Sequence, residues 1–168
     1  MTNKTLTELR GRADAAWANL MRQLEGMDAH LDRTDAPGEW TAREVLSHLL
    51  FEAGADPASL VARFDVKNLP LLEFEAGVTH LDAARRTMTL TQFREGLDGH
   101  RRHLFAYLET LPEGDLAGRK ARIPLFKTFL GTDEVPIGTF VGAMFDYHWN
   151  DHASQLGKIR KAVGLPQA

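Results

Sequence analysis

The sequence contains no cysteine, and this absence removes several kinds of chemistry at once. Without a thiol, the chain has no disulfide bond, no nucleophilic cysteine and no thiolate ligand for a metal ion. Any metal ion must therefore be held by histidine, aspartate or glutamate side chains. A thiol that takes part in a reaction would have to come from a separate small molecule.

Long apolar runs and an excess of positive charge are also missing. No stretch approaches the ~20 apolar residues that a membrane-spanning helix needs, and the polar start MTNKTLTELR does not resemble a signal peptide. The net charge is −3 and the isoelectric point is near 6.2, so the basic surface typical of nucleic-acid-binding proteins is absent. We therefore expect a cytoplasmic protein that binds neither nucleic acid nor a membrane.

Four segments carry the three-and-four spacing of apolar residues that is typical of amphipathic helices. Thr41 and Glu44 form a capping-box pattern at the start of the second segment. Pro136 and Gly164 lie where the fourth helix should begin and end. The predicted helices cover residues 5–27, 41–64 with a kink near Pro57, 91–111 and 136–163.

The connections between the second, third and fourth helices are about 20 residues long, which is too long for simple hairpins. We therefore predict an all-α fold, a four-helix bundle with at least one long crossover connection. The connection 112–135 is interrupted by glycine and proline, and we expect a short strand pair there, before the last helix. With 168 residues, of which 43% are apolar, the chain should form a single domain over residues 1–168.

His148 and His152 lie four residues apart, within the apolar stripe of the last predicted helix. A buried imidazole needs partners for both of its ring nitrogens. A divalent metal ion is one such partner, because neutral histidines bind it at ~2.0–2.1 Å and side chains one turn apart can converge on it. The alternative is a pair of hydrogen-bonded core histidines.

A metal site needs a third ligand from another helix, and His48 in the second helix is the best candidate. Glu52, one turn further along, is a fourth ligand, a carboxylate that orients His48, or a solvated side chain. His100 in the third helix either approaches the same cavity or is a hydrogen-bonded core residue. We expect the other histidines and the paired arginines to be solvent-exposed: His30, His80, His103, Arg85, Arg86, Arg101 and Arg102.

Other metal and nucleophile motifs do not fit this sequence. HWNDH has Trp149 where HExxH proteases have a catalytic glutamate, and the chain ends too soon after it for the inverted motif. A di-iron bundle requires Glu-x-x-His pairs, which the sequence lacks. Ser47 and Ser154 do not lie in a nucleophile-elbow context.

Two segments, GEWTAREVLSHLL and YHWNDHASQLGKIRKAVGLP, resemble the DinB-like (YfiT-like) superfamily. The first resembles its Trp–Ser/Thr–helix–His opening and the second its HxxxHxxQ closing helix, and the resemblance covers essentially the whole chain. It implies an up-down-down-up bundle, commonly a homodimer, and a nickel or zinc site formed by His48, His148 and His152. Members of this superfamily include transferases and isomerases that use a low-molecular-weight thiol, such as bacillithiol or mycothiol, and some hydrolases.

Three neutral histidines leave an open coordination position, as in catalytic rather than structural metal sites. We therefore predict a metal-dependent enzyme that acts on a small molecule, as a thiol-dependent S-transferase or a hydrolase, with a stress or detoxification role by analogy. The candidate contacts to the ligands or the substrate are Asp151, Gln155, Tyr147 and Glu52. The alternative is a non-catalytic helical bundle that binds a metal or dimerises.

Overall fold

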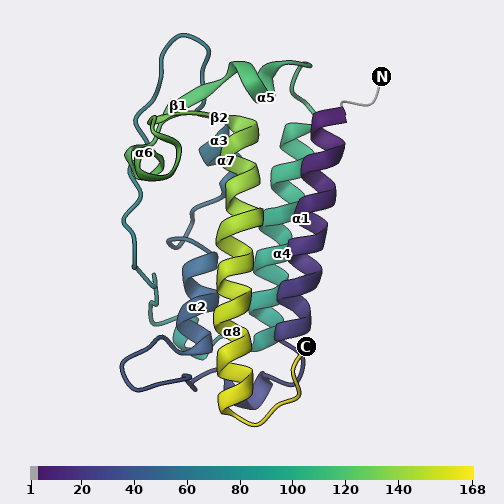
Figure 1. The fold of residues 1–168 in the computed structure, drawn as a ribbon, viewed down its shortest axis with the longest axis vertical. Helices are drawn as coiled ribbons and strands as arrows, with labels where there is room; N and C mark the ends of the chain where they lie inside the picture. The colour runs from purple at the N-terminus through teal and green to yellow at the C-terminus, as the bar shows by residue number, and fades with distance from the viewer. Residues whose placement is uncertain (1–3) are drawn as a thin grey trace.

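The computed structural model describes residues 4–168, which form a helical bundle with one small sheet (Figure 1). The predicted four-helix bundle is confirmed. None of the helices formed by these residues has the length and hydropathy needed to cross a lipid bilayer. The elements are α1 (Lys4–Gln23), η1 (Asp28–His30), α2 (Ala42–Leu49), α3 (Pro57–Val61), η2 (Arg85–Thr87), α4 (Leu90–Leu108), α5 (Asp115–Gly118), β1 (Lys120–Arg122), α6 (Pro124–Leu130), β2 (Glu134–Pro136), α7 (Ile137–Ala143), η3 (Met144–Trp149) and α8 (Asn150–Ala162).

The α2–α3 segment runs parallel to α4. Arg43, near the start of α2, donates a hydrogen bond to the carbonyl of Met88, just before α4 begins. Asp56, which caps α3, lies 3.1 Å from the ring of His103, which is near the end of α4. The crossover connection of residues 62–89 returns the chain to the other end of the bundle and makes this parallel arrangement possible.

The first and last helices also run parallel to each other. Arg12 pairs with Asp146 at 2.7 Å, and Asn19, two turns further along α1, donates to Asn150 at 2.9 Å. Hydrogen bonds between α1 and α4 join opposite ends, so these two helices are antiparallel. The predicted up-down-down-up order of the four helices is therefore confirmed.

The short sheet closes one end of the bundle, beside α5 and α6 (Figure 1). It is the strand pair expected before the last helix. The crossover connection adds single bridges to β1, and the central pair of the sheet, Ala121 and Val135, is fully buried. The antiparallel register is Lys120↔Pro136, Ala121↔Val135 and Arg122↔Glu134.

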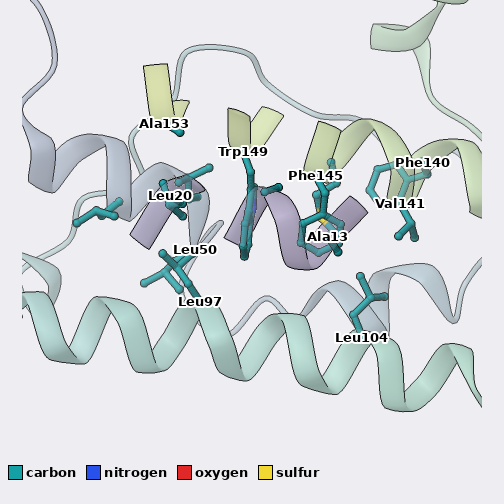
Figure 2. Packing of buried hydrophobic residues seen from close by; sticks show 14 of the residues in the cluster. Ala13, Leu20, Leu50, Leu97, Leu104, Phe140, Val141, Phe145, Trp149 and Ala153 are labelled. Carbon is teal, nitrogen blue, oxygen red and sulfur yellow. The ribbon is translucent and has the colours of Figure 1, made fainter. Parts of the chain in front are cut away.

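The core lies along the axis of the bundle, where the apolar stripes of the helices meet. Leu20 of α1, Leu97 of α4 and Trp149 of η3 are buried there (Figure 2). Full burial of one such side chain contributes about 1.5–3 kcal/mol to stability. The buried apolar residues along the first predicted helix are Leu9, Ala13, Ala16, Leu20, Leu24 and Met27.

The prediction for the second helix was wrong at its C-terminal end. The helix ends at Leu49 rather than near Pro57, because Phe51 takes a left-handed backbone conformation with φ 60°. The guanidinium group of Arg85 donates to the carbonyl of Phe51, which stabilises the chain in this non-helical path. A separate helix, α3, then begins where the Asp56 side chain accepts hydrogen bonds from two backbone amides.

The last helix is continuous over residues 137–162 but contains a π-helical turn, η3, that the regular spacing of an α-helix does not predict. This turn includes His148, and the adjoining α8 includes His152. π-Helical turns within α-helices frequently occur at functional sites. The predicted apolar stripe of this helix is still the buried face, because both Phe145 and Ile159 have their side chains in the core.

Several side chains predicted to be solvated are not. Arg85 is buried with 7% of its surface exposed, and only 19% of the Arg101 side chain is exposed because it pairs with acidic residues on α1 and α4. His30 and His80 are half-buried. The predicted exposure is confirmed for Arg86, Arg102 and His103.

Candidate metal centre

Three histidines from two separate parts of the chain lie together. His48 is near the C-terminus of α2, His148 is in η3, and His152 follows one turn later in α8. One ring nitrogen from each lies within 4.8 Å of the others. The Nε2 atoms of His48 and His148 are 2.8 Å apart, which is a hydrogen-bond distance. The structure thus brings together the three residues that the sequence singled out as ligands.

Two of the three rings have their tautomer set by an oxygen acceptor. The Nδ1–H of His48 donates to the carbonyl of Val78 at 2.7 Å. The Nδ1–H of His152 donates to the Oε1 of Gln155 at 2.8 Å. Because a neutral imidazole carries one proton, Nε2 of both rings is left as an unprotonated acceptor. Outer hydrogen bonds of this kind are typical of histidines that bind metals.

Burial keeps all three rings uncharged at neutral pH. Burial, together with the neighbouring imidazoles, lowers the pKa of His148 to about 3. Burial is also the largest cause that lowers the pKa of His48 and of His152. Neutral imidazoles are the form that binds metal ions, so the three rings need no net loss of a proton before they bind a cation.

The donor set fits a transition metal ion. Among residues 4–168, the group of potential ligand atoms consists of three imidazoles and contains no carboxylate. Imidazoles suit zinc and nickel, whereas magnesium and calcium prefer oxygen ligands. Because Nε2 of His48 is an acceptor, the contact at 2.8 Å requires that Nε2–H of His148 donates a hydrogen bond to it. Nε2 of His148 can act as a ligand once its proton lies on Nδ1 instead.

Aromatic residues that the sequence analysis did not assign to the site surround the histidines. The Trp40 ring lies 6.1 Å from the His152 ring, and the two planes differ by 7°. The Phe51 ring lies 6.4 Å from that of His148. Trp40 precedes the capping box of α2, within the quoted GEWTAREVLSHLL segment, so its position there was the signal that could have identified it.

His80 was also missed, because it lies in the long crossover connection and was expected to be exposed. Its ring is nearly parallel to that of His48, with ring centroids 6.2 Å apart. Val78, two residues earlier, provides the carbonyl that binds His48. No local sequence pattern links these two residues to a helix that lies 30 residues away.

The four candidate accessory residues occupy different positions. Gln155 contacts the site directly through His152. Asp151 is exposed, and its charge offsets only part of the lowering of the His152 pKa that burial causes. Tyr147 lies on the surface with 77% of its area exposed.

Glu52 is not on the edge of α2, because the helix ends before it, and the residue is exposed in the following turn. The expectation that Glu52 orients His48 was wrong, since the carbonyl of Val78 occupies that ring nitrogen. Glu52 also lies outside the group of ligand atoms found within residues 4–168.

His100 lies outside the histidine group as well. It borders a narrow pocket together with Leu49, Met144, Phe145 and Trp149. Its Nδ1 is buried and has no hydrogen-bond partner among the described residues. Neither of the two expectations for His100, an approach to the metal cavity or a hydrogen-bonded core position, agrees with this arrangement.

Comparisons with known proteins support the fold. No protein-family model matches this chain, and no curated protein matches it significantly in sequence. A solved structure that is similar is that of YfiT from Bacillus subtilis, described as a probable metal-dependent hydrolase with an unusual four-helix bundle topology. The TM-score is 0.74 with 16% identical residues, over 99% of this chain and 91% of that chain. The resemblance to YfiT-like proteins is thereby confirmed at the level of the fold.

Proposed function

We propose that this chain is a metal-dependent enzyme in which His48, His148 and His152 hold one divalent transition metal ion, with zinc or nickel favoured. The observation that carries the proposal is the convergence of three neutral imidazoles, two of which have unprotonated Nε2 atoms set by outer hydrogen bonds. The description of YfiT as a probable metal-dependent hydrolase supports the same reading.

The chemistry would be hydrolysis of a small molecule. A divalent ion held by three imidazoles has an open position at which the pKa of a bound water or thiol is lowered. The Val78 carbonyl accepts a hydrogen bond from Nδ1–H of His48, and the Gln155 side chain accepts one from Nδ1–H of His152. Trp40 and Phe51 flank the imidazoles with apolar rings, which limit the access of water and suit a substrate with an apolar part.

A second candidate reaction is the transfer of a low-molecular-weight thiol to an electrophile. The absence of cysteine means that such a thiol must come from a small-molecule cofactor. The ligand group contains no carboxylate or thiolate, so an anionic thiolate would balance the charge of the ion. Asp151, Tyr147 and Glu52 stay candidates for contact with either substrate. A homodimer, a cytoplasmic location and a role in stress response stay predictions from the resemblance.

Metal content is the first test. Protein purified without a polyhistidine tag should contain about one transition metal ion per chain by elemental analysis. Replacement of both His148 and His152 by Ala should abolish binding, whereas replacement of the exposed His103 should not. Full metal content in the double variant would overturn the proposed site.

Turnover is the second test and separates an enzyme from a non-catalytic bundle. We expect metal-dependent consumption of ester or amide substrates, or of a generic electrophile in the presence of a panel of small thiols. The double variant at His148 and His152 is the control for both assays. Stoichiometric metal without turnover of any of these substrates would favour a bundle that binds a metal but has no catalytic role.

A further inference from the structure

Arg85 is a buried cation whose partners are oxygen atoms of the main chain and of one hydroxyl group. It donates to the carbonyl of Ser47 at 2.8 Å and to the Ser47 hydroxyl at 3.3 Å. It also donates to the carbonyls of Phe51 and His80. Burial lowers the pKa of this guanidinium group. Burial of a charged group costs free energy, so the buried position of Arg85 requires an explanation.

Two of those carbonyls belong to residues with a strained backbone. Phe51 has φ 60° and His80 has φ 53°, and within residues 4–168 these are the two residues other than glycine with positive φ. Such a conformation is unfavourable for a residue with a Cβ atom. It persists only where the surroundings hold it, and it is concentrated at functional sites. Here a single side chain, Arg85, binds both carbonyls.

The segments that Arg85 joins are the two that support His48. Ser47, whose carbonyl it binds, directly precedes His48 at the end of α2. His80 lies two residues after Val78, the residue that accepts the Nδ1–H of His48. The guanidinium group therefore connects the backbone that carries the imidazole to the backbone that sets its tautomer.

We propose that Arg85 is a positioning residue of the metal centre. It fixes the end of α2 against residues 78–80, so that Val78 keeps the proton of His48 on Nδ1 and leaves Nε2 free to bind a cation. This inference rests on the proposed function, because it assumes that the three histidines hold a metal ion. It adds that His80 contributes to the site through its backbone carbonyl, which Arg85 binds, and not through its imidazole.

Arg160 is a matched control for Arg85. It is 4% exposed, and its acceptors are also backbone carbonyls, those of Gln23, Glu25 and Pro166. These contacts tie α8 to the end of α1, to the turn after it and to the C-terminal segment, and they involve none of the three histidines. Loss of either arginine should lower stability, but only the loss of Arg85 should change the metal site.

The test uses the full chain without a polyhistidine tag, stripped of metal, with Co²⁺ as the probe. The wild type, R85M, R85K and R160M are compared by thermal unfolding without metal, by Co²⁺ affinity and by the Co²⁺ absorption spectrum. We expect R85M to weaken Co²⁺ binding by roughly 10–100-fold, as for other outer partners of metal ligands, and to change the spectrum. R85K, which keeps a charged donor, should recover part of the affinity. R160M should lower the melting temperature with wild-type affinity and spectrum.

Two further variants keep the inference falsifiable if R85M does not fold. Asp82 accepts the backbone N–H of Arg85 at 2.8 Å, so D82A should loosen the turn that carries Arg85 and weaken Co²⁺ binding by a smaller factor. H80G keeps the carbonyl and tolerates positive φ, so it should bind Co²⁺ like the wild type.

Wild-type Co²⁺ affinity in R85M would overturn the positioning role of Arg85. If R85M is unfolded, wild-type Co²⁺ affinity in D82A would overturn it. A loss of Co²⁺ affinity in R160M equal to that in R85M would also overturn it. Weaker binding in H80G would show that the imidazole acts instead of the carbonyl. A wild type that binds no Co²⁺ would refute the proposed function itself, which separates the two failures.

Discussion

The metal-free protein should lose stability as the pH falls from 7 to 5, and the buried His148 should account for about 2 kcal/mol of that loss. The pKa of His148 is lowered from its ordinary value of 6.5 to about 3 by burial and by the neighbouring imidazoles. The unfolded chain therefore takes up a proton below pH 6.5 that the folded chain refuses. The stability is present above pH 6.5 and is lost progressively as the pH falls toward 3.

The magnitude follows from the width of this window. Between pH 6.5 and 5 the folded ring stays neutral, and each pH unit costs about 1.4 kcal/mol for one such group. The loss of about 2 kcal/mol is large beside the total stability of roughly 5–15 kcal/mol for a small domain. The lowered pKa values of His48 and His152 act in the same direction.

Urea unfolding of the metal-free wild type and of H148Q at pH 7 and pH 5 measures this effect. The difference between the two pH values should be about 2 kcal/mol smaller in H148Q, because glutamine cannot be protonated in this range. An equal pH dependence in the two proteins would refute the reasoning, since it would mean that His148 is protonated as easily in the folded state as in the unfolded chain.

Two other predictions test the site and the bundle separately. Gln155→Leu removes the acceptor that sets the tautomer of His152 and should weaken metal binding by roughly 10–100-fold in a chelator competition assay; unchanged affinity would contradict this role. Gly99→Ala, in α4 with no atom within 4 Å of the added Cβ, should stabilise the bundle by about 0.5–1 kcal/mol. Gly96→Ala, one turn earlier, should stabilise the bundle less than Gly99→Ala, because its Cβ would lie 3.0 Å from the Leu50 side chain. Thermal unfolding distinguishes them, and an equal or larger rise in melting temperature for Gly96→Ala would refute the packing argument.

Local patterns were enough to predict the main helical segments and to identify His148 and His152 as candidate ligands. The capping box of Thr41 and Glu44 forms as predicted at the start of α2, because its hydrogen bonds join residues three positions apart. His148 and His152 face the interior together because one turn of helix separates them. The hydrogen bond between His152 and Gln155 is also local, so the HxxxHxxQ spacing already contained it.

The partners of His48 could not be read from the sequence in the same way. The end of α2 at Leu49 depends on a hydrogen bond from Arg85, more than 30 residues later. Arg85 itself was expected in solvent because a cation is rarely buried. Its burial depends on several backbone carbonyls that only the folded chain brings together.

The sequence by itself therefore determined the four main helical segments, their buried faces and the histidines that could bind a metal, since each depends on spacing within one helix. The tertiary structure alone decided where α2 ends and which carbonyl accepts the hydrogen bond of His48. It also decided that Trp40, Phe51 and His80 lie beside the histidines. These features arise where the crossover connection packs against the bundle. Contacts of that kind join residues without any fixed spacing along the chain, and their energies depend on the whole fold.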